Sequence, residues 1–271
     1  MSRRSSVSRV AVGALLAVVA GMASGLAAAA PGVEKDVVAA PELQFGNGML
    51  TRRIALSPDG TQFVGGFADG RARIFDTDSG AVVRVLSGHA SPVYPVAFSP
   101  DGTRVATGAM DGSAVLWDVA SGNAVHVCLG HTAVVIGIAF SPDGTQLLTA
   151  SMDMTAGLWD TGSGALLRSF SGHSGAVLSA DFSSDGKNVL TGSMDNTARL
   201  WETETGAVLG TFSGHTAPVN AVAFSSDGAM VLTGSSDSSA RLWDATTFVQ
   251  IRSFIAHSGT VSSVEFSPDG Q

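Results

Sequence analysis

A repeat of 42 residues organises most of this chain. The dipeptide Gly-His recurs at this interval, and so does a tryptophan followed by an acidic residue. The Gly-His pairs begin at Gly88, Gly130, Gly172 and Gly214, and the tryptophans are Trp117, Trp159, Trp201 and Trp243. A turn of the form Ser-Pro-Asp-Gly or Ser-Ser-Asp-Gly keeps the same register six times. A fixed period of this length indicates similar supersecondary units that stack side by side.

Each unit contains four apolar segments separated by turn residues. In the unit 131–172 we predict strands at 134–140, 146–151, 156–159 and 165–171. The first two are joined by Ser141-Pro-Asp-Gly, in which proline presets φ and glycine supplies a positive φ. The glycine count of 33 favours many short strands over helices. The unit is therefore an antiparallel sheet of four strands.

The Gly-His and Trp-Asp pairs at this spacing resemble the repeats of the WD-repeat (Trp-Asp repeat) β-propeller family. The likeness is to an exported member of bacterial type with near-identical repeats, and it covers roughly residues 39–271. It implies an all-β propeller of four-stranded antiparallel blades, with five full blades and the start of a sixth. Because the sixth unit breaks off in its first turn, we expect a truncated six- or seven-bladed propeller. If the chain is complete, it must stay open or close by pairing with another copy.

The N-terminal segment has the pattern of an export signal. Residues 1–9 carry three arginines, and residues 10–33 carry no charge. The alanines at 27–30 provide small residues for cleavage. We therefore expect residues 1–30 to be a signal peptide or an uncleaved N-terminal membrane anchor, 31–38 a linker and 39–271 the propeller. The protein would be exported, either periplasmic or secreted, and would contact a membrane only if the segment is uncleaved.

Composition excludes several classes of function. The formal net charge is −8 and there are only two lysines, so the clustered cations that nucleic-acid binding needs are missing. The single cysteine, Cys128, allows neither an intrachain disulfide nor a cysteine zinc site, and its column in the repeat predicts a packing residue. His126 shares a column with three arginines and is expected to face solvent. We expect no cofactor and no metal.

The family resemblance implies a buried hydrogen-bonded network of histidine, a hydroxyl residue, aspartate and tryptophan. The matching residues are His131, Ser151, Asp153 and Trp159, then His173, Ser193, Asp195 and Trp201, then His215, Ser235, Asp237 and Trp243. The repeat containing His89 has Ala109 at the hydroxyl position, so its network should be incomplete. A Ser-His-Asp set can suggest a hydrolase. A nucleophile occurs once, however, whereas this set recurs three times, and we expect no enzyme.

Two columns of the repeat are candidates for partner binding, because the resemblance places them on the face that propellers commonly use. One column, at the start of the innermost strand, contains Arg52, Tyr94, Ile136, Leu178 and Asn220. The other, just before the turn aspartate, contains Met110, Met152 and Met194. Flexible, polarizable methionines suit a surface that receives apolar side chains. Alternatively, these methionines pack under the loops or were copied by repeat duplication.

These observations favour a non-catalytic protein–protein interaction scaffold that acts outside the cytoplasm. Its partner would be a protein or peptide, or a second copy of the chain if the open propeller is the real product. The alternative is a carbohydrate- or small-ligand-binding propeller, or an enzyme built on one. Sugar sites favour exposed aromatic platforms, yet every tryptophan occupies the repeated position and Tyr94 is the only tyrosine.

Overall fold

The chain folds into twenty strands, with no helix among the residues that the structure describes. The computed structural model describes residues 50–267, and side chains from Ile54 on. The strands of the first two sheets are β1 (Leu50–Leu56), β2 (Gln62–Phe67), β3 (Arg71–Asp76), β4 (Val82–Ser87), β5 (Val93–Phe98), β6 (Arg104–Ala109), β7 (Ala114–Asp118) and β8 (Ala124–Cys128). The remaining strands are β9 (Val135–Phe140), β10 (Gln146–Ser151), β11 (Thr155–Asp160), β12 (Leu166–Ser171), β13 (Val177–Phe182), β14 (Asn188–Ser193), β15 (Thr197–Glu202), β16 (Val208–Ser213), β17 (Val219–Phe224), β18 (Met230–Ser235), β19 (Ala240–Asp244) and β20 (Gln250–Phe254).

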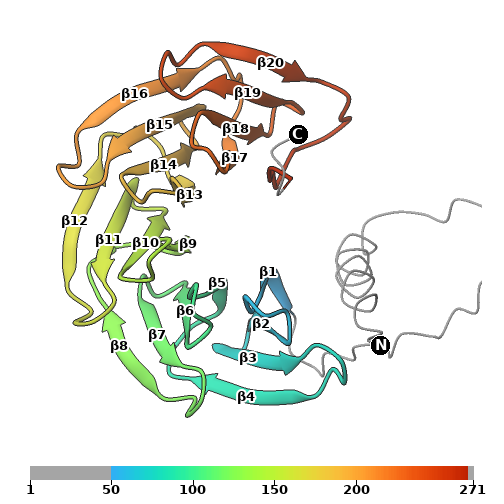
Figure 1. Cartoon of the computed structure of the whole chain (residues 1–271), viewed down its shortest axis with the longest axis vertical. Coiled ribbons are helices and arrows are strands. Elements are labelled where there is room, and N and C mark those ends of the chain that lie inside the picture. The colour runs from blue at the N-terminus through green and yellow to red at the C-terminus, as the bar shows by residue number, and fades with distance from the viewer. Residues whose placement is uncertain (1–49, 268–271) are drawn as a thin grey trace, which may run out of the picture. The chain divides into compact units, whose positions relative to one another are not determined.

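Consecutive strands form five four-stranded antiparallel sheets, each paired in chain order. The first strand of every sheet contacts the first strand of the next sheet. Figure 1 shows these first strands (β1, β5, β9, β13 and β17) on the inside of an open arc, with β4, β8, β12, β16 and β20 on its rim. The predicted all-β propeller architecture and the four strands of each unit are confirmed.

The repeated Ser-x-Asp-Gly turn sets the first hairpin of each sheet. In the third sheet the Gly144 N–H donates to the Ser141 carbonyl at 2.9 Å, and Gly144 has φ +72°. The Ser141 hydroxyl donates to Asp143 Oδ1 at 2.6 Å, and the same carboxylate accepts the Thr145 N–H. The equivalent glycine in each of the five sheets has φ between +69° and +72°. The turn is thus fixed by local hydrogen bonds and by glycine, as the sequence predicts.

The core lies on the middle strands of each sheet. In β10 the last five residues are buried, whereas the outermost strand β12 keeps one buried residue, Phe170. Cys128 is fully buried on β8, and burial raises the pKa of its thiol to about 11. The prediction that Cys128 is a packing residue is confirmed.

Outer strands hold neighbouring sheets together through a repeated contact. The Arg84 guanidinium on β4 donates to the Ala120 carbonyl of the second sheet at 2.7 Å. His126 Nε2 lies 2.8 Å from the Gly162 carbonyl of the third sheet, and Arg168 donates to the Thr205 carbonyl of the fourth at 2.9 Å. His126 is half-buried, so it faces solvent in part, as expected. Its column also forms a junction to the next sheet, which the sequence did not predict.

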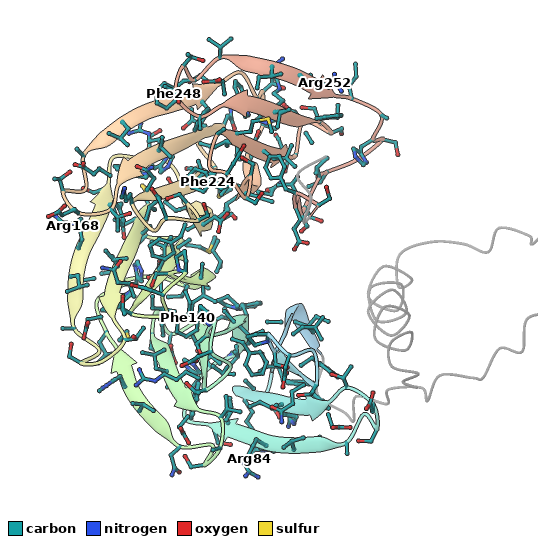
Figure 2. All side chains as sticks on the ribbon, in the orientation of Figure 1. Arg84, Phe140, Arg168, Phe224, Phe248 and Arg252 are labelled. Atoms are coloured by element: carbon teal, nitrogen blue, oxygen red, sulfur yellow. The ribbon has the colours of Figure 1, made fainter. Side chains whose placement is uncertain are left out.

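The junction between the fourth and fifth sheets is built differently. Gly210 stands at an outer-strand position that is arginine or histidine in the other four sheets. Phe248 stands at a turn position that is glycine in the other four sheets. A Cβ on Gly210 would lie 2.3 Å from the Phe248 ring, so the aromatic ring occupies the space of the missing side chain. Phe248 accepts a positive φ of +61° to do so. Figure 2 labels Arg84, Arg168 and Phe248 along this rim.

We predict that this exchange is a compensated pair. Phe248→Gly should lower the free energy of unfolding by about 1–2 kcal/mol, because lost ring packing outweighs relief of the positive φ. Gly210→Arg alone should destabilise the fold by a similar amount through its clash with Phe248. The double variant should recover most of the loss, as measured by urea unfolding. Additive losses in the double variant would contradict the pairing.

The start of the sixth unit packs on the fifth sheet without forming a strand. Residues 260–266, with which the sixth unit begins in the sequence, form no assigned strand. Val261 is buried, and its N–H donates to the Ser235 carbonyl at 2.9 Å. Its own carbonyl accepts from Asn220 Nδ2 at 3.2 Å.

Candidate functional site

A hydrogen-bonded chain of side chains ties together the inner part of each sheet. In the fourth sheet Trp201 Nε1 donates to the Thr191 hydroxyl at 2.8 Å, and that hydroxyl lies 2.8 Å from His173 Nε2. His173 Nδ1 lies 2.8 Å from Asp195 Oδ2. Burial lowers the pKa of His173, although Asp195 opposes this shift, so the ring is neutral at neutral pH. The consistent assignment is that Nδ1–H donates to Asp195 while Nε2 accepts from Thr191.

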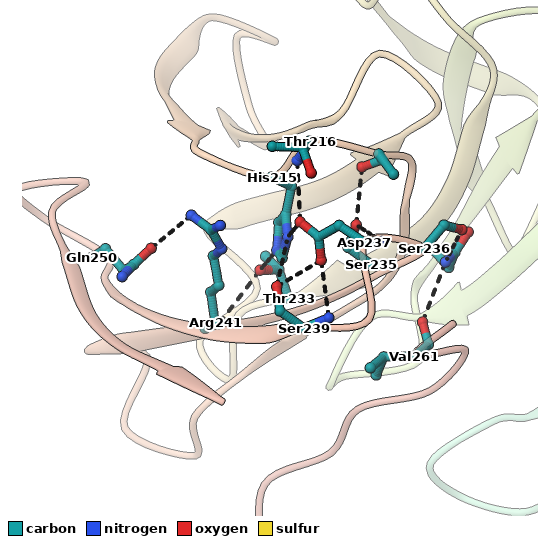
Figure 3. Close-up of polar contacts among 12 residues, drawn as sticks. His215, Thr216, Thr233, Ser235, Ser236, Asp237, Ser239, Arg241, Gln250 and Val261 are labelled. Carbon is teal, nitrogen blue, oxygen red and sulfur yellow. Dashed lines mark hydrogen bonds and ion pairs between the residues drawn. The ribbon is translucent and has the colours of Figure 1, made fainter. Parts of the chain in front are cut away.

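The aspartate of the network also closes the turn between the second and third strands. Asp195 Oδ1 accepts the Thr197 hydroxyl at 2.6 Å, and Oδ2 accepts the Ser174 N–H at 3.1 Å. Burial raises the pKa of Asp195, but hydrogen bonds from Thr197 and His173 outweigh it and lower the pKa to about 2. The carboxylate is therefore ionised across the physiological range. Figure 3 shows the same arrangement around His215, Thr233, Asp237 and Ser239 in the fifth sheet.

The hydroxyl in this network is a threonine and not the predicted serine. Thr149, Thr191 and Thr233 contact both the histidine and the tryptophan of their sheets. The predicted Ser151, Ser193 and Ser235 each donate to a backbone carbonyl and accept the N–H of the turn aspartate. The serines thus position the aspartate through its backbone. The predicted histidines, aspartates and tryptophans lie together as expected.

The second sheet keeps the centre of the network and changes its end. Thr107 lies 2.7 Å from His89 Nε2 and accepts from Trp117 at 2.8 Å. His89 Nδ1 lies 2.9 Å from the Ser113 hydroxyl but 3.8 Å from the Asp111 carboxylate. With Ala109 in place of serine, the backbone of Asp111 has no hydroxyl to bond. The expected incompleteness is confined to this aspartate.

The first sheet replaces the network with apolar groups. Phe75 occupies the tryptophan position and stacks on Phe63 with ring centroids 4.8 Å apart. Gly65 stands at the threonine position, so no buried indole N–H or hydroxyl needs a partner. Asp69 instead pairs with Arg73. Asn47, at the histidine position, lies outside the described residues.

We predict that the threonine of the network contributes more to the free energy of unfolding than the serine does. Thr191→Val should lower the free energy of unfolding by about 2–4 kcal/mol, because it leaves the buried Trp201 N–H and one His173 nitrogen unpaired. Ser193→Ala is the matched control and should cost about 1–2 kcal/mol. Urea unfolding measures both values. An equal or larger loss for Ser193→Ala would show that the serine carries the network.

The two candidate columns for partner binding meet at one edge of the second, third and fourth sheets. In each of these sheets the backbone N–H of the methionine donates to a carbonyl just before the innermost strand. The Met152 N–H, for example, donates to the Val134 carbonyl, two residues before Ile136, at 2.9 Å. The side chains of Met110, Met152 and Met194 are 45 %, 44 % and 48 % exposed. Tyr94, Ile136 and Leu178 are half-buried beside them. We call these six residues the methionine arc.

The ends of the arc are more polar. The Tyr94 hydroxyl lies 3.4 Å from Met110 Sδ within the second sheet. In the fifth sheet Asn220 Nδ2 donates to the Ser236 hydroxyl at 2.9 Å, so this sheet carries a polar pair in the arc's columns. The backbone of Arg52 belongs to β1, but its side chain lies outside those described.

One exposed methionine was missed from sequence. Met154 is 48 % exposed two residues after Met152, and it has φ +71°. The first two sheets have Gly70 and Gly112 at this position, also with positive φ. The sequence signal that could have identified Met154 is a non-glycine residue at a turn position that is glycine in other repeats.

Asp181 is a second residue that sequence comparison passed over. It stands on β13 in a column that is alanine in the first, second, third and fifth sheets. Its Oδ2 accepts the Phe224 N–H of β17 at 3.0 Å, and Ser179 accepts the Val222 N–H at 3.3 Å. These two side chains join neighbouring inner strands. Burial raises the pKa of Asp181 to about 6 despite the hydrogen bonds from Phe224 and Phe182.

We predict that Asp181→Asn stabilises the fold at neutral pH. A carboxyl whose folded pKa lies above its unfolded value of 3.8 favours the folded state when protonated, and this advantage is lost as pH rises through 6. The asparagine carries no charge, and its one carbonyl oxygen keeps the bond from the Phe224 N–H while the bond from the Phe182 N–H is lost. The gain should be about 1–2 kcal/mol at pH 7.5 and should vanish below pH 4, measured by urea unfolding. A pH-independent difference would contradict the titration.

The geometry of the sheets and their networks defines the class of protein. Four-stranded sheets follow one another around an arc, and each full network joins histidine, threonine, aspartate and tryptophan, as in a β-propeller. The family model described as "WD domain, G-beta repeat" matches residues 80–118, 122–160, 164–202, 206–244 and 248–271. The chain belongs to the WD-repeat family. No curated protein matches the sequence at a significant level.

Members of this family generally mediate protein–protein interactions and are typically non-catalytic scaffolds. Within residues 50–267, no three histidine, cysteine or carboxylate side chains converge to hold a metal ion. The same residues include no helix of the length and apolarity needed to cross a membrane. The expected export signal or anchor, 1–30, and the linker, 31–38, lie outside the described residues.

Proposed function

We propose that this chain is a non-catalytic scaffold that binds a protein or peptide through the methionine arc. The main support is that three consecutive sheets present half-exposed methionine side chains next to half-buried Tyr94, Ile136 and Leu178. Exposed apolar side chains that gather on one edge favour association with another apolar surface. Methionine side chains adapt to different partners at small conformational cost.

The burial of the tryptophans disfavours a sugar-binding function. The four tryptophans are at most 2 % exposed, and their indole N–H groups donate to threonines inside the sheets. They therefore offer no aromatic platform at the surface. The net charge of −8 disfavours nucleic acid as a partner.

We further propose that the scaffold acts outside the cytoplasm, periplasmic or secreted. The support is the arginine-containing start of the chain, followed by the uncharged segment 10–33 and its alanines. A fusion of residues 1–38 to alkaline phosphatase should be active in a bacterial host, because that enzyme folds only after export. An inactive fusion that is stably made would contradict the proposal.

The arc is tested by site-specific photo-crosslinking in the native host. A photoreactive phenylalanine analogue at position 152 or 194 should give a discrete crosslinked partner, because these side chains would lie in the interface. The same analogue at Leu167, which is 48 % exposed on the outer strand β12, is the matched control and should give none.

Introducing a negative charge into the methionine arc provides the second measurement. Met152→Asp and Met194→Asp together should reduce capture of the crosslinked partner at least tenfold, because a carboxylate is costly to bury against an apolar surface. Leu167→Asp should leave capture unchanged, and the melting temperature of both variants should stay near that of the parent. Undiminished capture by the double variant would overturn the proposal.

A further inference from the structure

The methionines of the arc are not required by the turn on which they stand. Their column contains Ala68 in the first sheet and Ser236 in the fifth. The Ser236 N–H donates to the Pro218 carbonyl at 2.9 Å, which is the bond that the Met194 N–H makes to the Ala176 carbonyl at 2.8 Å. Serine therefore serves the backbone as well as methionine does. The thioether side chain contributes to the surface and not to the turn.

Methionine differs from the other apolar side chains because its sulfur can be oxidised reversibly. Peroxide converts the thioether into a polar sulfoxide, and methionine sulfoxide reductases restore it. Met110, Met152 and Met194 are 45 %, 44 % and 48 % exposed, so a small oxidant reaches them in the folded protein. Met154 is also 48 % exposed but lies outside the arc.

The other sulfur and indole side chains among residues 50–267 are better protected. Cys128 is fully buried, and burial raises the pKa of its thiol to about 11. The reactive thiolate is therefore scarce at neutral pH. The four tryptophans are at most 2 % exposed, and Met230 is half-buried. Within this part of the chain, peroxide should react first at the exposed methionines.

The three sulfurs of the arc have different surroundings. The Tyr94 hydroxyl lies 3.4 Å from Met110 Sδ and donates to it, since a thioether sulfur is a weak acceptor. This bond engages the electron pair with which the sulfur attacks an oxidant. The same column holds isoleucine and leucine in the third and fourth sheets, and neither has a donor. Met110 should therefore oxidise more slowly than Met152 and Met194.

We propose that Met152 and Met194, and more slowly Met110, are sites of reversible oxidation by hydrogen peroxide that switches off partner binding at the arc. The sulfur lone pair attacks one peroxide oxygen, so that an S–O bond forms while the O–O bond breaks. The sulfur loses two electrons to the peroxide. The second oxygen leaves as hydroxide and takes the proton of the first, which gives water. The loss of binding rests on the proposed function of the arc, whereas the oxidation does not.

A sulfoxide turns the apolar arc into a polar surface. Its oxygen is a strong hydrogen-bond acceptor, and against an apolar partner it would lose its water without gaining a donor. Three such groups on consecutive sheets would each oppose binding. The free protein keeps its fold, because these side chains are nearly half exposed and water still solvates the new oxygens.

The sites are tested by treating the purified full-length protein with hydrogen peroxide and following each methionine by peptide mass spectrometry. Met152, Met154 and Met194 should oxidise at similar rates, Met110 at least twofold more slowly and Met230 at least fivefold more slowly. Tyr94→Phe should raise the rate at Met110 to that at Met152. Equal rates at Met110 and Met152 in the parent would overturn the protection by Tyr94. Oxidation of Met152 and Met194 no faster than that of Met230 would overturn the assignment of the sites.

The switch is tested by capture of the partner that crosslinks to position 152. Oxidation of the parent should reduce capture at least tenfold, and treatment with both methionine sulfoxide reductases and dithiothreitol should restore it. The variant with Met110→Leu, Met152→Leu and Met194→Leu keeps an apolar arc, so its capture should survive peroxide. Met154→Leu is the matched control and should lose capture on oxidation as the parent does.

The contrary outcomes separate the switch from the proposed function. Full capture by the oxidised parent overturns the switch and leaves the arc as a binding surface. A parent that captures no partner before oxidation overturns the proposed function and the switch with it. Loss of capture by the oxidised triple leucine variant assigns the effect to residues outside the arc. A fall in the melting temperature of the oxidised parent shows damage to the fold in place of a switch.

Discussion

One threonine hydroxyl in each full repeat serves two buried partners, and the geometry of the sheet edge depends on it. In the fourth sheet the hydroxyl of Thr191 accepts the indole N–H of Trp201 and donates to the imidazole of His173. The imidazole then holds the carboxylate of Asp195, which closes the next turn. Because each donor in this chain of hydrogen bonds has its own acceptor, the bonds hold four parts of the sheet together. These are the loop at His173, the strands that carry Thr191 and Trp201, and the turn at Asp195. The methionine arc is carried on this fixed edge.

Departures from the repeat come in matched sets. Where Phe75 replaces tryptophan, Gly65 replaces threonine, so that no buried donor is left alone. Ala150 stands in a column of glycines on the second strands, and its cross-strand neighbour is Gly137, whose added Cβ would lie 2.9 Å away. Close packing leaves no room for a side chain to enlarge unless its neighbour shrinks. The repeats therefore differ by compensated exchanges.

The same physics explains which features sequence analysis could predict. Period, strand order and turns are recoverable, because a turn glycine such as Gly144 has one backbone requirement wherever it occurs. The hydroxyl of the network was misassigned since Thr149 and Ser151 lie two apart on one strand and point to the same face. Only the three-dimensional arrangement decides which of the two reaches Trp159. The contact of His126 was not predicted because its partner, the Gly162 carbonyl, belongs to another sheet.

Function in such a chain depends on what differs between the sheets. Buried networks must recur, since each sheet has to satisfy its own polar groups. Exposed positions are free of this requirement, and the methionine arc lies at such positions.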